Sequence, residues 1–208
     1  MGARRTEALA RKIAGIVAAE IGASPEDREV YEFALKLVID TMLDVAVIFS
    51  LAYVFGVLRP VAVAYVLVAI LKYFAGGAHA SKMVNCLILG TIVYLGLGLA
   101  ARGLGQLSEQ ISWAAFLSVG MLATVVFFRH APVTPPNKPL KSVRHRNYLR
   151  KNAMITLGVV LAAMTIWLTR PFSSPDVFWS GLLALVWQSL ILLPGCQRLF
   201  DTLERFMF

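Results

Sequence analysis

Charged residues are scarce in this sequence of 208 residues. Only 15% of them are Asp, Glu, Lys or Arg, whereas 58% are hydrophobic and the mean hydropathy is +0.71. Soluble domains of ordinary composition carry about 25% charged and about 45–50% apolar residues. The apolar residues here also form long uncharged blocks, which the bilayer interior demands of a spanning helix. The composition therefore excludes an ordinary soluble domain and predicts an all-α integral membrane protein.

Cysteine and histidine are also rare, with two and three residues respectively. Cys86 and Cys196 are too few for a disulfide framework, so we expect free thiols. No His or Cys residues have the spacing of metal ligands, and neither a metal site nor a cofactor is predicted. The N-terminus alternates charged and apolar residues without an uninterrupted apolar stretch, so no signal peptide is expected.

The apolar blocks predict six membrane spans within a single membrane domain, residues 1–208. The second span is short for the roughly 20 residues that a crossing helix needs, and a re-entrant segment would have the same pattern. Residues 1–24 and 195–208 have the amphipathic pattern of helices that lie at the membrane surface. Arg59-Pro60 is expected to end the first span. Spans 1–4 are placed within residues 25–128 (25–58, 60–74, 83–101 and 111–128), and spans 5–6 within residues 152–194 (152–169 and 177–194).

The distribution of positive charge predicts which way the chain faces. With six spans and a cytoplasmic N-terminus, all but three of the 20 Lys and Arg residues fall on the cytoplasmic side. The three on the outer side are Arg59, Arg102 and Arg170. This bias follows the positive-inside rule, so both termini and the basic loop at residues 129–151 are expected in the cytoplasm.

The loop between the second and third spans, residues 72–86, carries the candidate chemistry. A diglycine, Gly76-Gly77, breaks the helix; His79 follows, and Cys86 lies seven residues beyond it. On one straight helix these two would be about 10 Å apart, too far for the imidazole to activate the thiol. If the helix begins near Ser81, His79 can fold back over the first turns and act as base and later as acid for a cysteine that attacks a carbonyl. Taken alone, the two residues also fit a buried small hydrophobe and a solvated polar side chain.

Two further groups of residues invite a functional interpretation. Asp40 and Asp44 lie one turn apart near the cytoplasmic start of the first span, where one of them can orient His79; a pair with Lys36 or a water-exposed helix end is the favoured alternative. The basic loop has no acidic residue and only Tyr148 as an aromatic, so nucleic-acid binding is not expected. It is expected to contact anionic lipid or an acidic part of a substrate. The residues assigned to this contact are Lys138, Lys141, Arg144, Arg146, Arg150 and Lys151.

These motifs carry a family resemblance. Gly76-Gly77-Ala78-His79-Ala80, with Cys86 seven residues after the histidine, resembles the active-site motif of the accessory gene regulator B (AgrB) family. Ala131-Pro132-Val133 followed by Pro136-Asn137-Lys138-Pro139-Leu140 is similar to the loop signature that follows the family's fourth span. The length, the span pattern and the order of both motifs agree over nearly the whole chain.

The resemblance implies a bacterial membrane cysteine endopeptidase of quorum sensing. Such an enzyme cuts an AgrD-like propeptide on its C-terminal side, holds the peptide as a thioester, and allows a Cys or Ser of the peptide to close a thiolactone or lactone ring. It implies Cys86 as nucleophile, His79 as general base, a supporting role for Gly77, and a homodimer. Where the family tends to carry arginine, seven residues before the histidine, this chain has Lys72, which keeps the charge but loses the planar fork.

Two other classes of function remain open from the sequence, a peptide transporter or exporter and a non-catalytic signalling scaffold. A transporter is expected to place ionisable residues at mid-membrane depth. Here they gather at the cytoplasmic edge, and the spans after residue 83 are almost free of charge. The pattern favours chemistry at the membrane interface.

Overall fold

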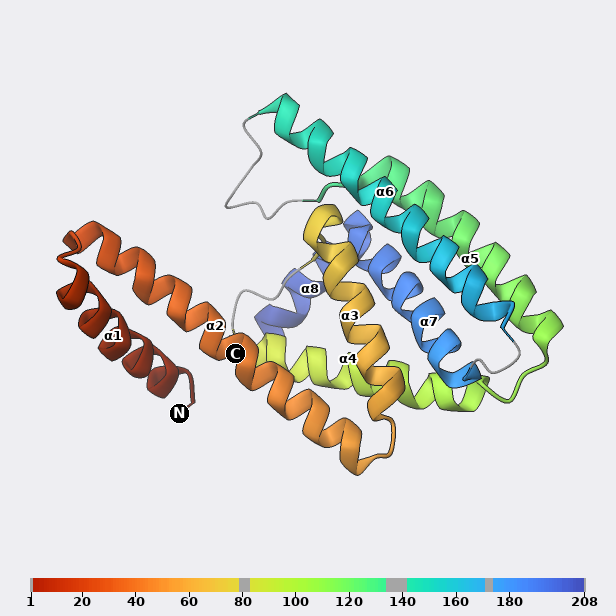
Figure 1. The fold of residues 1–208 in the computed structure, drawn as a ribbon, viewed down its shortest axis with the longest axis horizontal. Coiled ribbons are helices and arrows are strands. Elements are labelled where there is room, and N and C mark those ends of the chain that lie inside the picture. The colour runs from red at the N-terminus through yellow and green to blue at the C-terminus, as the bar shows by residue number, and fades with distance from the viewer. Residues whose placement is uncertain (1, 79–82, 134–141, 171–173, 208) are drawn as a thin grey trace.

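The computed structural model describes residues 2–78, 83–133, 142–170 and 174–207 (Figure 1). Within these ranges the chain is helical, with one isolated bridge between Gly76 and Val133. Six helices, α2 to α7, are long and apolar enough to cross a membrane, which confirms the predicted fold class. The helices are α1 (Gly2–Ile21), α2 (Pro25–Val54), α3 (Leu58–Ala75), α4 (Met83–Leu104), α5 (Glu109–His130), α6 (Val143–Leu168), α7 (Pro175–Leu192) and α8 (Pro194–Met207).

Helix α7 lies at the centre of the bundle, between α3, α4 and α5 (Figure 1). Its most apolar 18-residue stretch is 61% buried, against 17–33% for the other five spans. A helix that is apolar on every side is suited to such a position. Among its buried residues are Ser180, whose hydroxyl donates to the carbonyl of Pro60, and Gln188. The central position of α7 lets it contact the diglycine segment at the end of α3, residues 76–78.

Helix α1 and the first half of α2 form a hairpin that extends away from the other helices (Figure 1). An alanine stripe of α1, Ala10, Ala14 and Ala18, is buried, and Arg11 Nε donates to Glu32 Oε1 of α2 at 3.0 Å. The bulkier apolar residues of the predicted amphipathic face are exposed, with Ile16 at 61%. The hairpin therefore packs through small side chains and leaves its larger apolar ones available to lipid.

The first two spans differ from the prediction at their junction. The chain turns at Gly56, which has a φ of +69°, and α3 already begins at Leu58. Arg59-Pro60 therefore lies in the first turn of α3, where proline is tolerated because its missing N–H has no helical partner. With this earlier start, α3 is one continuous helix of 18 residues, about 27 Å long, which nearly matches the hydrocarbon core.

The second part of the expected basic loop, residues 143–151, is helical. Helix α6 begins at Val143, not near residue 152, and the Ser142 hydroxyl caps it by accepting from the His145 N–H at 3.4 Å. The prolines of this region all precede residue 142, and nothing between Ser142 and Gly158 breaks a helix. Charged residues indicate where a helix emerges from the hydrocarbon region of the membrane, but they do not terminate the helix. Residues 144–151 therefore form the charged first turns of α6.

Candidate active site

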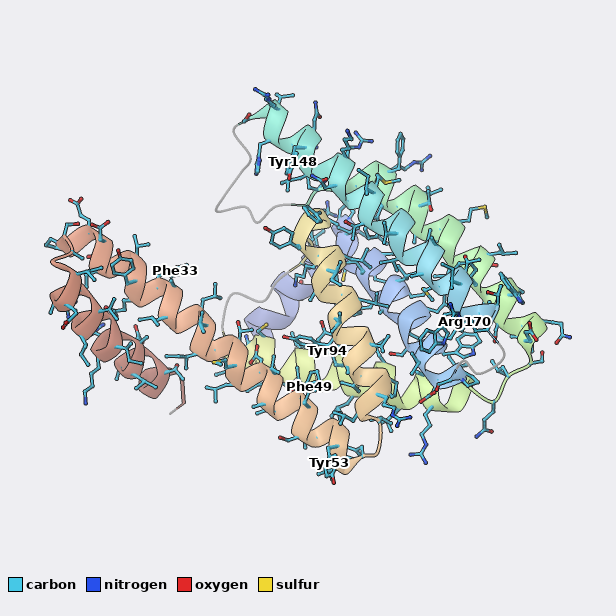
Figure 2. All side chains as sticks on the ribbon, viewed as in Figure 1. Phe33, Phe49, Tyr53, Tyr94, Tyr148 and Arg170 are labelled. Atoms are coloured by element: carbon cyan, nitrogen blue, oxygen red, sulfur yellow. The ribbon has the colours of Figure 1, made fainter. Side chains whose placement is uncertain are left out.

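A cavity of about 250 Å³ lies where α2, α3, α4 and α7 meet. Cys86 lines it from α4, together with Lys72 from α3 and Asp44 from α2. Most of the remaining lining is aliphatic or aromatic, with Tyr65 and Tyr94 in ring contact at a centroid distance of 5.0 Å. Figure 2 labels Tyr94 and Phe49 in this region, where Phe49 extends the aromatic group by a contact of 5.7 Å with Tyr65. The arrangement presents a thiol, an ammonium group and a carboxyl group in largely apolar and aromatic surroundings.

Cys86 is half-buried and lies three residues after Met83, the first residue of α4 that the structure describes. Backbone N–H groups near a helix start favour the thiolate form of a cysteine, and so does a nearby cation. Lys72 supplies a cation to the same cavity, and its ammonium donates to the carbonyl of Ala78 in a long contact of 3.4 Å. Cys86 therefore lies near a described helix start and in the same cavity as a cation, two features that favour the thiolate.

The diglycine segment, residues 76–78, is held on two sides. On one side, Gly76 forms the isolated bridge with Val133, and the Val133 N–H donates to the carbonyl of Ala75 at 2.9 Å. On the other side is α7, where Gln188 Nε2 donates to the carbonyl of Gly76 at 2.9 Å and the Ile191 carbonyl accepts from the Ala78 N–H at 3.0 Å. The two sequence motifs, more than 50 residues apart, therefore meet at this bridge.

Both glycines are required by this geometry. Gly76 has a φ of +70° and Gly77 a φ of +137°, backbone conformations that side chains disfavour. A Cβ on Gly76 would lie 1.9 Å from the backbone oxygen of Val133, and one on Gly77 would lie 2.9 Å from Cδ1 of Ile191. The diglycine is therefore where α3 ends and where the chain passes closely against its neighbours.

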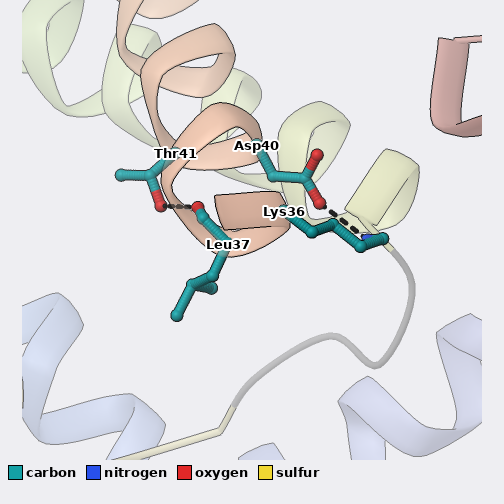
Figure 3. A network of polar contacts seen from close by, with 4 residues as sticks. All are labelled: Lys36, Leu37, Asp40 and Thr41. Carbon is teal, nitrogen blue, oxygen red and sulfur yellow. Dashed lines mark hydrogen bonds and ion pairs between the residues drawn. The ribbon is translucent and has the colours of Figure 1, made fainter. Parts of the chain in front are cut away.

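Asp40 and Asp44 of α2 have different surroundings. Asp40 accepts from Lys36 Nζ at 2.8 Å (Figure 3), as the favoured alternative expected, and it does not line the cavity. Asp44 lines the cavity. The Oδ1 atoms of both residues are buried and have no hydrogen-bond partner among the described residues, so the cavity is what distinguishes them. One turn of helix thus separates an ion-paired carboxylate from one that faces the thiol's cavity.

Four of the residues assigned from the sequence lie outside the described residues: His79, Ser81, Lys138 and Lys141. The pairing of His79 with Cys86 therefore stays a prediction. The diglycine segment that leads directly into His79 is described, and Ala78 lines the same cavity as Cys86.

The basic residues at the start of α6 are exposed, but they do not all have free side chains. Arg150 Nη2 donates to the carbonyl of Phe128 at 2.5 Å, and its guanidinium lies 4.8 Å from the centre of the Phe128 ring. Arg150 therefore joins α6 to α5. Arg144, Arg146 and Lys151 are exposed on the same helix. Figure 2 labels Tyr148 on this part of α6.

Sequence reasoning missed the contribution of α7. Gln188 is fully buried and holds the diglycine segment, while Trp187 and Ile191 line the cavity. A glutamine inside an otherwise apolar span was the available signal, because a buried amide needs partners. Cys196 lies on α8 and does not line the cavity; burial raises the pKa of its thiol, which makes it a weaker nucleophile.

Comparison with known proteins gives a consistent result over most of the chain. A family model described as Accessory gene regulator B matches residues 10–192. A protein described as AgrB-like from Clostridium perfringens (strain SM101 / Type A) is 22% identical over 96% of this chain and 97% of its own length. Another, from Listeria monocytogenes serovar 1/2a, is 23% identical over 62% of this chain and 63% of its own length. No solved structure matches.

Proposed function

Because this chain belongs to the accessory gene regulator B family, we propose that it is a membrane cysteine endopeptidase that processes an AgrD-like propeptide. The observation that carries the proposal is the position of Cys86 in a cavity with Lys72, beside the diglycine segment that leads to His79. A nucleophile, a cation and an adjacent base are the parts that acyl transfer through a thioester needs.

The proposed reaction has two acyl transfers. The Cys86 thiolate attacks the scissile carbonyl, a C–S bond forms and the C–N bond breaks, and the leaving amine takes a proton from His79. A thiol or hydroxyl inside the retained peptide then gives its proton to His79 and attacks the thioester carbonyl. A new C–S or C–O bond closes the ring, and Cys86 leaves as thiolate. Lys72 favours the thiolate at the start and at the end of this sequence.

The apolar lining of the cavity favours ring closure over hydrolysis. Residues such as Val68, Leu89 and Trp187 cover most of the wall around Cys86. Where few water molecules reach the thioester, the peptide's own nucleophile reacts first because it is tethered at high effective concentration.

The proposal also covers orientation and partners. The positive-inside bias supports a site on the cytoplasmic face of a bacterial membrane. The exposed cations of α6, Arg144, Arg146 and Lys151, support contact with an acidic part of the propeptide or with anionic lipids. The family resemblance supports a homodimer.

The test is co-expression with an AgrD-like propeptide, followed by mass spectrometry of the peptide. The wild type is expected to shorten the peptide, and Cys86→Ala and His79→Ala are expected to leave it intact. Cys196→Ala is the matched control, because it removes the other thiol and should cleave normally. Cleavage by Cys86→Ala would refute the proposal and bring the transporter and scaffold functions forward.

A further inference from the structure

One oxygen of the Asp44 carboxylate lacks a hydrogen bond within the described structure. Asp44 lines the cavity that holds Cys86, its Oδ1 is buried, and that atom has no hydrogen-bond partner among the described residues. No ion pair of Asp44 occurs within the described ranges either. A buried carboxyl oxygen left without a hydrogen bond in apolar surroundings is costly whether the group is ionised or neutral. Such a group points to a ligand that completes its hydrogen bonds.

Charge in the cavity limits what that ligand can be. A cationic side chain would be attracted by Asp44 but repelled by Lys72, which lines the same cavity. An anionic group would be attracted by Lys72 but repelled by Asp44. A neutral amide suits both residues, because its N–H donates to a carboxylate and its C=O accepts from an ammonium. A backbone amide has this pair of groups at every residue of a peptide.

The size of the cavity agrees with a short stretch of peptide. Its volume of about 250 Å³ is below the roughly 300–1,000 Å³ of pockets that enclose a whole small-molecule ligand. The tyrosines, Val68 and Ile48 leave apolar room for a side chain or two. The remainder of a propeptide must lie outside it.

We propose that Asp44 binds the substrate by accepting a hydrogen bond from one backbone N–H next to the scissile bond, and so places the adjoining carbonyl at Cys86. The inference rests on the proposed function for the identity of the peptide. Asp44 is then a substrate-binding residue, distinct from the nucleophile and the base. Asp40, one turn away and paired with Lys36, takes no part.

The test is a binding cycle on the Cys86→Ala protein in lipid nanodiscs, where no peptide is consumed. The probes are the propeptide and a set of its copies, each N-methylated at one backbone amide in the region that is cut. Replacing Asp44 by Leu is expected to weaken binding of the unmodified propeptide about 10- to 100-fold, the cost of a lost hydrogen bond to a charged group. Asp40→Leu, the matched control, is expected to leave the dissociation constant within about twofold.

The N-methylated copies identify the bond itself. One of them is expected to bind the Asp44-intact protein as weakly as the Asp44→Leu protein binds the unmodified propeptide, with little further loss when both changes are combined. The inference would be overturned if, for every N-methylated copy, the losses of binding free energy from N-methylation and from Asp44→Leu simply added. Asp44→Asn keeps an acceptor of the same shape, so it should retain more affinity than Asp44→Leu; equal loss in both would also overturn it.

The binding measurement is independent of catalysis, so the two proposals can fail separately. A non-additive pair in a protein that never cleaves the propeptide would refute the proposed function and leave Asp44 as a peptide-binding residue. Cleavage that requires Cys86, with additive losses throughout the cycle, would refute only the role of Asp44.

Discussion

Replacing Gly76 by alanine is expected to damage the protein more than any other single methyl group added to its glycines. The new Cβ would lie 1.9 Å from the Val133 oxygen, so Val133 must retreat by about 1.5 Å to reach the 3.4 Å of ordinary contact. Because the blocking atom belongs to the backbone, no rotamer change can relieve the overlap. The retreat breaks the hydrogen bond from the Val133 N–H to the carbonyl of Ala75.

The magnitude follows from two costs. A residue with a side chain in the conformation of Gly76, at φ +70° and ψ −147°, is strained by about 1–3 kcal/mol. A buried backbone pair that loses its hydrogen bond costs about 1–3 kcal/mol more. The sum of about 2–6 kcal/mol corresponds to a fall in melting temperature of roughly 4–24 °C for a chain of this length.

Two other glycines give a graded comparison. Gly77→Ala would place a Cβ 2.9 and 3.0 Å from Cδ1 and Cγ1 of Ile191, and in ordinary contact, 3.4 Å, with its backbone oxygen. Because a side chain can yield, the change should cost about 1–3 kcal/mol, mainly from the φ of +137°. Ile191→Val should then relieve part of that loss. Gly96→Ala has nothing within 4 Å in the middle of α4 and should be neutral or stabilising by up to about 1 kcal/mol.

The assay is thermal unfolding of the purified protein in detergent, together with peptide processing in membranes. The expected order of loss is Gly76→Ala, then Gly77→Ala, then Gly96→Ala. A Gly76→Ala protein that melts and processes like the wild type would refute the reasoning, because it would show that residue 76 and Val133 are not in contact. Rescue of Gly76→Ala by Ile191→Val would refute it equally.

Three further predictions concern the surroundings of the site. Gln188→Leu removes the amide that donates to the Gly76 carbonyl, and it should slow processing about tenfold or more, as measured by initial rates in membranes. Ser189→Ala is the control and should not slow processing, because the Ser189 hydroxyl donates to Leu185 within α7. Reversing the charge of Arg144 should raise the KM for the propeptide without changing the melting temperature. Arg150→Ala should lower the melting temperature, because it removes the contacts of Arg150 with Phe128 that join α6 to α5. A lower melting temperature for the Arg144 variant and an unchanged one for Arg150→Ala would contradict these contacts. In a chain without native cysteines, Ser108→Cys should react with a membrane-impermeant maleimide in intact cells, and Ser24→Cys only after permeabilisation; reversed labelling would invert the topology.

The spans could be predicted from the sequence because lipid imposes a simple rule. Long uncharged blocks must cross as helices, and the six expected crossings are all present as helices. The predicted helix boundaries were wrong at two places that hydrophobicity does not determine. At residues 143–151 the chain is charged yet helical, and at Gly56 a turn precedes the proline that was expected to end the helix. Both boundaries depend on local backbone geometry and capping, which hydropathy does not record.

The candidate site was only partly accessible to sequence reasoning. Cys86 and Lys72 were found through the motif and do line one cavity. The split between Asp40 and Asp44 was not predictable, because residues one turn apart share a helix face and only the tertiary contacts distinguish them. Gln188 was missed because it lies more than 100 residues from the motif that it holds.

The irregular backbone around the diglycine explains why α7 must be the most buried span. Non-helical backbone at membrane depth persists only where protein satisfies its polar groups. Here Gly76 N–H donates to Lys72, the Ala75 and Gly76 carbonyls accept from Val133 and Gln188, and Ala78 N–H donates to Ile191. Two of these partners come from α7 and one from the second motif. The irregular turn that ends α3 near Cys86 is therefore stabilised by a central helix and a distant loop, which supply its hydrogen bonds. This couples the geometry of the cavity around Cys86 to the packing of the bundle.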